Sequence, residues 1–210
     1  DPTNASRTML FHLRDAAWDP WLADLLGVPS VLLPEIRPSS GDFGLAAGEH
    51  LGITAPICGI AGDQQAALFG QGCWDVGLAK NTYGTGAFLL MNTGQTPVPS
   101  HHGLLTTAAC DAKGGLAYAL EGSVFIAGAA VQWLRDGLGL LETAEESAVM
   151  AGALGDNGGV YFVPAFVGLG APHWEPDARG MIVGLTRGTT KGHLVRAALE
   201  AMAFGTAEVL

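Results

Sequence analysis

The order of short apolar segments and turns in the middle of the chain constrains the fold most. Residues 78–92 predict two strands around the turn Gly84-Thr85-Gly86. Two further strands are expected at 104–109 and 116–120, and apolar residues at helical spacing follow over 124–138. This pattern predicts an antiparallel meander that leads into a helix.

Helices and strands alternate in the rest of the sequence as well. Residues 57–61 predict a buried strand that ends at Gly62-Asp63-Gln64-Gln65, and residues 64–70 predict a helix. An amphipathic helix is expected over 142–153 and an alanine-rich helix over 193–210. The mixture predicts an α/β fold.

Composition bounds the class of protein. The 210 residues are 49% hydrophobic and only 14% charged, which is enough apolar material for a core. The net charge of −10 argues against binding to nucleic acid. Apolar stretches are short and broken by glycine and proline, so we expect no membrane span and no signal peptide. The three cysteines fit no zinc spacing and are expected to be buried thiols in a reducing cytoplasm.

Both ends of the sequence are abrupt. The chain opens on Asp1-Pro2 and stops inside the helix expected over 193–210. We therefore expect an internal segment of a longer protein that crosses a domain junction near residues 70–76. Residues 1–72 would end a first domain, and residues 73–210 would begin a second.

Two motifs indicate chemistry. Asp63 is a lone carboxylate beside the amide of Gln64, which suits a base that takes a proton from a bound hydroxyl. The Gly84-Thr85-Gly86 turn suits close approach of backbone to phosphate. Together they suggest phosphoryl transfer to an alcohol. The alternatives are a helix N-cap for Asp63 and a solvated helix position for Gln64.

A second pair of residues shares one helix face. Gly128 and Gln132 are four residues apart, and a glycine there admits a ribose or base edge without a side-chain clash. The alternative is that Gly128 allows close helix packing.

Ordered motifs along the whole chain resemble the FGGY carbohydrate kinase family, and within it the members that phosphorylate glycerol. The matching stretches are 3–10, 60–71, 79–86, 121–125, 132–136, 162–166 and 184–193, the last running on to Glu200. The resemblance implies an actin-like ATPase (ribonuclease H-like) fold with two domains around a cleft. Members of the family are considerably longer.

The resemblance implies roles on the acceptor side. Asp63 corresponds to the catalytic base, which binds glycerol and lies near the Mg²⁺–phosphate site, so that its contact with the metal is indirect. Gln64 corresponds to a glycerol-binding position. Phe88 corresponds to an apolar wall against the carbon backbone of glycerol, although a strand-core role is equally open.

On the nucleotide side, the resemblance implies that Thr85 faces the terminal phosphates of ATP and that Gly128 and Gln132 bind ADP. The implied reaction is ATP-dependent phosphorylation of glycerol to sn-glycerol 3-phosphate with Mg²⁺. The full-length enzyme would be cytoplasmic and homo-oligomeric, and the 210 residues alone would be inactive. The alternatives are an FGGY kinase for another polyol or sugar and an inactive nucleotide-binding fragment.

Several other charged or titratable residues are expected to have no catalytic role. His101-His102 is expected to be a solvated loop pair, and Arg7, Arg187 and Lys191 to form ion pairs or surface charges. Lys80 would add positive potential beside the phosphate turn, without a specific role.

One departure from the family concerns regulation. Regulated bacterial members bind fructose 1,6-bisphosphate through an arginine in a glycine-rich run. The matching stretch 48–54 has no arginine and carries Glu49. Inhibition by fructose 1,6-bisphosphate is therefore predicted to be absent or weak.

Overall fold

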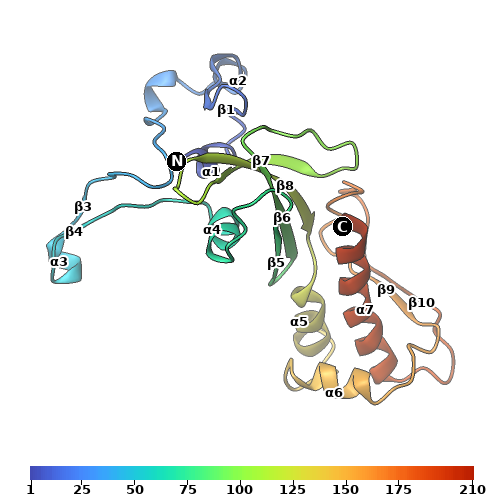
Figure 1. The fold of residues 1–210 in the computed structure, drawn as a ribbon. Helices are drawn as coiled ribbons and strands as arrows, with labels where there is room; N and C mark the ends of the chain where they lie inside the picture. Colours follow the sequence, from blue (N-terminus) through green and yellow to red (C-terminus); the bar gives the residue numbers. More distant parts are fainter. The chain divides into compact units, whose positions relative to one another are not determined.

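The computed structural model describes residues 1–210, which form two compact units (Figure 1). Unit 1 comprises Asp1–Lys80, Leu90–Ser100 and Leu105–Glu121, and unit 2 comprises Asn81–Leu89, His101–Leu104 and Gly122–Leu210. Because the chain passes repeatedly from one unit to the other, this division is not a single cut. The junction near residue 72 therefore stays a prediction about family domains.

Unit 1 begins with short elements joined by turns. They are α1 (Pro2–Ala5), β1 (Phe11–His12), β2 (Ala17–Trp18), α2 (Pro20–Leu25), a 3-10 turn (Ser30–Leu32), β3 (Leu45–Ala46), α3 (Gly48–Leu51), β4 (Ala55–Pro56) and α4 (Asp63–Gly70). Asp1 caps α1 and Asp19 caps α2, each through its carboxylate, and proline holds the first helical position of both. This combination favours helix initiation, which explains why such short helices form.

Four strands form the largest sheet. β5 (Ala79–Tyr83), β6 (Ala87–Gly94), β7 (Leu105–Cys110) and β8 (Leu116–Val124) lie in the order β5-β6-β8-β7. β7 and β8 are antiparallel, with register pairs from Leu105–Glu121 to Cys110–Leu116. In the turn between them, the Asp111 carboxylate accepts the amides of Lys113 and Gly115 at 2.8 and 2.9 Å. An aspartate that bonds the backbone in this way stabilises a tight turn.

The strand order corrects the expected meander. In a meander each strand pairs with the next in sequence, but here β8, not β7, lies beside β6. β8 is nine residues long and is buried or half-buried throughout, which suits a central strand. β7 begins at the exposed Leu105 and takes the edge.

The expected strand over 57–61 is also wrong. β4 ends at Pro56, and the segment after it is extended but outside any named strand, with one bridge between Gly59 and Ser40. Ile57 and Ile60 are each 39% exposed. The segment still bonds to residues 39–44, since Ile57 N–H donates to the Gly44 carbonyl at 2.8 Å and Ile60 N–H donates to the Ser39 carbonyl at 2.9 Å. These bonds do not form the regular ladder of a strand, and the residues stay partly exposed.

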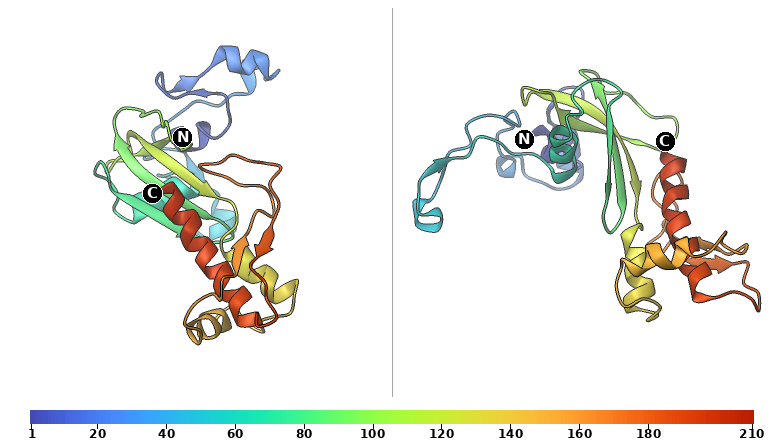
Figure 2. Two further views of the ribbon diagram at one scale, coloured as in Figure 1. Left: turned by 90° about the vertical axis from the view of Figure 1, so that its right-hand side faces the viewer. Right: turned by 60° about the horizontal axis from the view of Figure 1, so that its bottom comes forward.

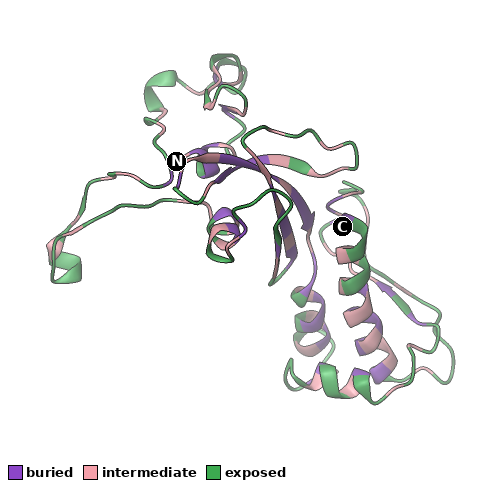
Figure 3. Ribbon diagram, viewed as in Figure 1, coloured by how far each residue is buried: buried purple, intermediate pink, exposed green.

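The core of unit 1 lies where α4 meets the sheet. Leu68 of α4 is buried with Cys73, Leu90 and small alanines of β7 and β8. Figure 3 shows the buried residues concentrated on β7 and β8. The alanines let the helix approach the strands closely, because they add little volume.

Unit 2 is built around a long helix. This helix is α7 (Lys191–Val209), and it follows α5 (Gly128–Asp136), α6 (Glu146–Gly152), β9 (Tyr161–Val163) and β10 (Met181–Val183) in the chain. α7 contacts α5, α6 and β9, and β9 pairs antiparallel with β10 (Figure 2). Thr190 and His193 form a capping box at the start of α7, which fixes where this helix begins. The predicted helix over 193–210 is thereby confirmed, two residues earlier than expected.

The core of unit 2 follows the helical spacing in the sequence. Ala130, Val131 and Leu134 of α5 are buried against Val195 and Ala198 of α7. α5 begins only at Gly128, because residues 116–124 continue as strand β8. The helix expected from 124 is therefore shorter than predicted.

The three cysteines differ in burial. All three cysteines are free; Cys73 and Cys110 are buried as expected, but Cys58 is exposed. Burial raises the pKa of the Cys110 thiol, and the charge of Asp111 acts in the same direction.

None of the helices combines the length and apolar character that a membrane crossing requires.

Candidate functional site

Asp63 and Gln64 open helix α4 in unit 1. Asp63 is exposed, and its Oδ2 accepts a hydrogen bond from Gln64 Nε2 at 3.0 Å. The N-cap residue is Gly62, and Asp63 is the first helical residue. The carboxylate therefore lies where the helix dipole favours a negative charge, without serving as the N-cap. This leaves its exposed oxygen atoms available to a ligand.

The segment before Asp63 is held by the N-terminal motif. The Gly62 amide donates to Thr3 Oγ1 at 2.7 Å, and Thr3 is fully buried. A Cβ on Gly62 would lie 2.6 Å from Gln65 Oε1, so only glycine fits there without a shift. Gln65 is buried and donates to Thr107 Oγ1 at 3.3 Å. The position of Asp63 is thus fixed from both sides by buried polar contacts.

Lys80 is a neighbour of the pair that the sequence did not assign. Its Nζ donates to Gln64 Oε1 at 2.5 Å, and the residue is only 7% exposed. Burial lowers the pKa of Lys80, while the charges of Glu121, Asp63 and Cys73 act in the opposite direction. The sequence signal for Lys80 is only that a lysine precedes the glycine turn. Its contact with Gln64 joins residues sixteen positions apart, so it leaves no local pattern.

Glu121 and Arg7 extend the same group of charges. Arg7 Nη1 and Nη2 donate to the two oxygens of Glu121 at 2.8 and 3.1 Å, a bidentate geometry. The Glu121 side chain is 2% exposed and that of Arg7 is 45% exposed. The prediction that Arg7 forms an ion pair is confirmed.

In unit 2, the Gly84-Thr85-Gly86 turn lies at the start of α5. The amides of Ala127 and Ala129 donate to the Thr85 carbonyl at 2.8 and 3.1 Å, and the amide of Gly128 donates to the Gly84 carbonyl at 2.9 Å. Gly84 N–H in turn donates to the Gly86 carbonyl at 2.8 Å. These bonds hold the turn rigidly, with the Thr85 side chain exposed.

One pocket of unit 2 collects the three residues predicted to bind nucleotide. Thr85, Gly128 and Gln132 line it together with Gly84 and Ser147, and its volume is about 460 Å³. Pockets of this size hold small molecules. Gly128 and Gln132 face it from one side of α5, as the spacing of four residues predicts.

The packing alternative for Gly128 has direct support. A Cβ at this position would lie 2.5 Å from the Gly84 carbonyl oxygen. A glycine is therefore required here even without a ligand, and the nucleotide role rests on the pocket instead. Arg135, a pocket residue that the sequence did not single out, donates to Asp136 at 2.6 and 2.9 Å. These bonds lower the pKa of Asp136.

The remaining predicted residue, Phe88, is half-buried in strand β6 and belongs to unit 2. Asp63 and Gln64 belong to unit 1. The structure thus groups the acceptor-side polar pair in one unit and the nucleotide-side residues in the other, with Phe88 among the latter.

The fit to Mg²⁺ can be judged from the donor atoms. No three His, Cys, Asp or Glu side chains come together as a metal cluster. Asp63 nevertheless offers an exposed carboxylate, and Mg²⁺ is often bound by one or two carboxylates together with substrate phosphates and water. The residues present therefore suit a metal that arrives with a nucleotide.

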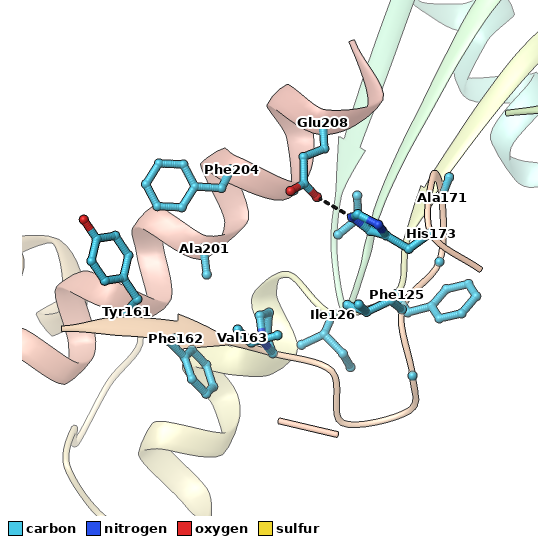
Figure 4. Close-up of a pocket in the computed structure, with 16 residues that line it drawn as sticks. Phe125, Ile126, Tyr161, Phe162, Val163, Ala171, His173, Ala201, Phe204 and Glu208 are labelled. Atoms are coloured by element: carbon cyan, nitrogen blue, oxygen red, sulfur yellow. Dashed lines mark hydrogen bonds and ion pairs between the residues drawn. The ribbon is translucent and has the colours of Figure 1, made fainter. Parts of the chain in front are cut away.

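A second pocket of unit 2, of about 250 Å³, holds none of the predicted residues (Figure 4). Apolar side chains such as Phe125, Ile126 and Phe162 line it. His173 Nε2 lies 3.1 Å from Glu208 Oε2 on its wall.

Comparison with known proteins decides the family. The N-terminal domain of the FGGY family of carbohydrate kinases matches residues 1–70, and the C-terminal domain of that family matches residues 79–210. The chain belongs to the FGGY family of carbohydrate kinases. The two matched ranges together take in Asp63, Gln64, the glycine turn and helix α5.

Individual FGGY proteins resemble the chain to different degrees. Glycerol kinase of Desulfitobacterium hafniense is 58% identical over 211 residues, which cover 100% of this chain and 43% of that protein. The chain thus spans less than half the length of this relative.

Solved FGGY structures share the fold. Plasmodium falciparum glycerol kinase with ADP superposes with a TM-score of 0.85 and 42% identity, over 100% of this chain and 42% of that one. Ligand-bound xylulose kinase from Lactobacillus acidophilus gives a TM-score of 0.80 and 25% identity, over 99% of this chain and 43% of that one. The predicted α/β actin-like ATPase fold class of FGGY kinases is confirmed.

Proposed function

We propose that the chain is part of an ATP-dependent glycerol kinase, which forms sn-glycerol 3-phosphate and ADP. The observation that carries the proposal is the degree of identity: 58% to a glycerol kinase, against 25% to a xylulose kinase of the same fold. The alternative of an FGGY kinase for another polyol is tested by the same assay, with a panel of acceptors.

On the acceptor side, Asp63 acts as the general base in this proposal. It accepts the proton of a glycerol hydroxyl while that oxygen bonds to the terminal phosphorus of ATP, whose bond to ADP breaks. Gln64 holds a second hydroxyl through its amide, and Phe88 provides an apolar wall for the carbon chain. The hydrogen bond between Asp63 and Gln64 supports their joint action.

On the nucleotide side, we assign Thr85, Gly128 and Gln132 to ATP and ADP. Their common pocket and the rigid turn support this assignment. A hydroxyl held by a rigid turn can stabilise developing charge without reorganising. Asp63 would face a nucleotide-bound Mg²⁺ indirectly, and the metal would supply charge neutralisation at the phosphate oxygens.

The proposal extends to the whole protein. We propose a domain junction near residue 72, and the gap between the matched ranges 1–70 and 79–210 supports this position. The full-length protein is proposed to be cytoplasmic and homo-oligomeric, and the three free cysteines agree with a reducing compartment. The 210 residues alone are proposed to be inactive, because they span less than half of the related kinase.

Absent or weak inhibition by fructose 1,6-bisphosphate is part of the same proposal. The stretch 48–54 contains α3, whose exposed Glu49 would repel a phosphate. Strong inhibition of the full-length enzyme by this compound would contradict it.

The test is an ADP-release assay on the full-length protein with ATP, Mg²⁺ and a panel of polyols and sugars. Glycerol should give the highest kcat/KM. A higher kcat/KM for another acceptor would contradict glycerol as the substrate. ADP release that needs no acceptor at all would contradict kinase activity.

A further inference from the structure

Lys80 is an unusual residue to bury. Moving an ammonium group out of water costs free energy unless charges and hydrogen bonds replace the water. The structure supplies both, because Lys80 donates to Gln64 and its pKa responds to Glu121 and Asp63. An apolar side chain of similar length would fill the same space without this cost. Packing therefore gives no reason for a lysine at this position.

The contacts of Gln64 determine the orientation of its amide. A lysine ammonium can only donate and an ionised carboxylate can only accept. Oε1 must therefore face Lys80, and Nε2 must face Asp63, as the distances of 2.5 and 3.0 Å show. A flipped amide would place two donors together at one end and two acceptors together at the other.

Charge around the pair is balanced within unit 1. Arg7 and Lys80 carry two positive charges, and Glu121 and Asp63 carry two negative charges. Arg7 binds Glu121 through both oxygens, so that this carboxylate keeps a partner if Lys80 is replaced. The ammonium of Lys80 lies at hydrogen-bond distance from the Gln64 side-chain oxygen.

We propose that Lys80 is a positioning residue for the acceptor pocket, which orients the Gln64 amide and through it the Asp63 carboxylate. This inference rests on the proposed function, since Gln64 and Asp63 bind the acceptor there. With its oxygen held by Lys80, Gln64 has one N–H for Asp63 and one for an acceptor hydroxyl. Donation by the ammonium also polarises the amide and makes those N–H groups better donors.

A double-mutant cycle on the full-length enzyme tests this inference. The four proteins are the parent, Lys80→Met, Gln64→Ala and the double variant, and KM for glycerol and for ATP is measured for each. Lys80→Met should raise KM for glycerol about 10- to 100-fold, the effect of losing a hydrogen bond to a charged group. KM for ATP should change less than about twofold.

In the Gln64→Ala background, Lys80→Met should change KM for glycerol by less than about threefold, because its target is gone. Effects that multiply independently would overturn the inference, as would equal changes in both KM values. Lys113→Met makes the same substitution at an exposed turn and should leave both values unchanged.

Thermal unfolding of the same proteins gives a result that needs no turnover. The Tm change of the double variant should differ from the sum of the two single changes, because the contact is lost only once, and additive changes would overturn the contact itself. If the parent phosphorylates another polyol in place of glycerol, the substrate assignment fails while the kinetic cycle on that polyol still decides the role of Lys80. If the parent has no kinase activity, the proposed function fails and the Tm cycle decides.

Discussion

The backbone amide of Gly128 donates a hydrogen bond to the carbonyl oxygen of Gly84 at 2.9 Å, which ties the first residue of α5 to the glycine turn. The two backbones approach so closely that a Cβ on Gly128 would lie 2.5 Å from that oxygen. The walls of the proposed nucleotide pocket are thus set by contact between two glycines.

Replacement of Gly128 by alanine should disturb this contact. Because the obstacle is a backbone atom, the turn has to move, and we expect KM for ATP to rise at least about 10-fold and stability to fall by about 1–3 kcal/mol. Gly152→Ala is the matched control, since its Cβ meets nothing within 4 Å. That variant should be neutral or slightly more stable. Steady-state kinetics and urea unfolding measure both, and equal behaviour of the two variants would contradict the steric account.

The Thr85 hydroxyl should matter for phosphoryl transfer. Thr85→Val keeps the branched shape of the side chain and replaces the hydroxyl with a methyl group, so the turn should remain intact. We expect kcat to fall about 10-fold or more with KM for glycerol nearly constant. Thr96→Val, at another exposed threonine, serves as the control. Initial-rate kinetics with each substrate varied would measure this fall in kcat. An unchanged kcat would remove Thr85 from the mechanism.

The pair Arg7–Glu121 should contribute to stability. Arg7→Met removes both hydrogen bonds from a carboxylate that is 2% exposed. We expect a loss of about 1–3 kcal/mol, less than for a fully buried pair because Arg7 itself is half-exposed. Arg37→Met removes the exposed Arg37–Glu35 pair and should cost less stability than Arg7→Met, because water screens exposed charges. Urea unfolding compares the two, and a reversed order of losses would contradict this account.

Lys80 should give stability a dependence on pH. Burial places its folded-state pKa below the ordinary 10.5. The unfolded chain then binds more protons between the two values, so the free energy of unfolding rises with pH in the window that ends near 10.5. The stability of Lys80→Met minus that of the parent should therefore fall as pH rises through this window. Urea unfolding at several alkaline pH values measures the difference, and a constant value would contradict the prediction.

Local patterns accounted for much of the fold. The strands around Gly84-Thr85-Gly86 formed where alternation and glycine predicted them, and α7 where the alanine-rich stretch did. The order of β6, β8 and β7 could not be predicted, because it depends on which strand buries both faces. The apolar run 57–61 predicted a buried strand, but it bonds irregularly to residues 39–44, and Ile57 and Ile60 stay partly exposed. Burial depends on tertiary neighbours, which a local apolar pattern does not show.

For the candidate site, sequence motifs identified Asp63, Gln64 and the glycine turn, whose roles stay predictions. The contact of Lys80 with Gln64 was not predicted, because it joins residues sixteen positions apart through tertiary structure. The requirement for glycine at 128 also arises from contact with Gly84 across forty-four positions of the chain, which no local spacing shows.

The most direct test of the central claim is the glycerol-dependent ADP release of full-length Asp63→Asn compared with the parent. Asparagine keeps the size of the side chain and cannot accept the proton, so kcat should fall about 10²- to 10⁴-fold while KM for glycerol changes little. Asp75→Asn, at another exposed aspartate, should keep full activity. A kcat for Asp63→Asn within about threefold of the parent would contradict the assignment of Asp63 as the base.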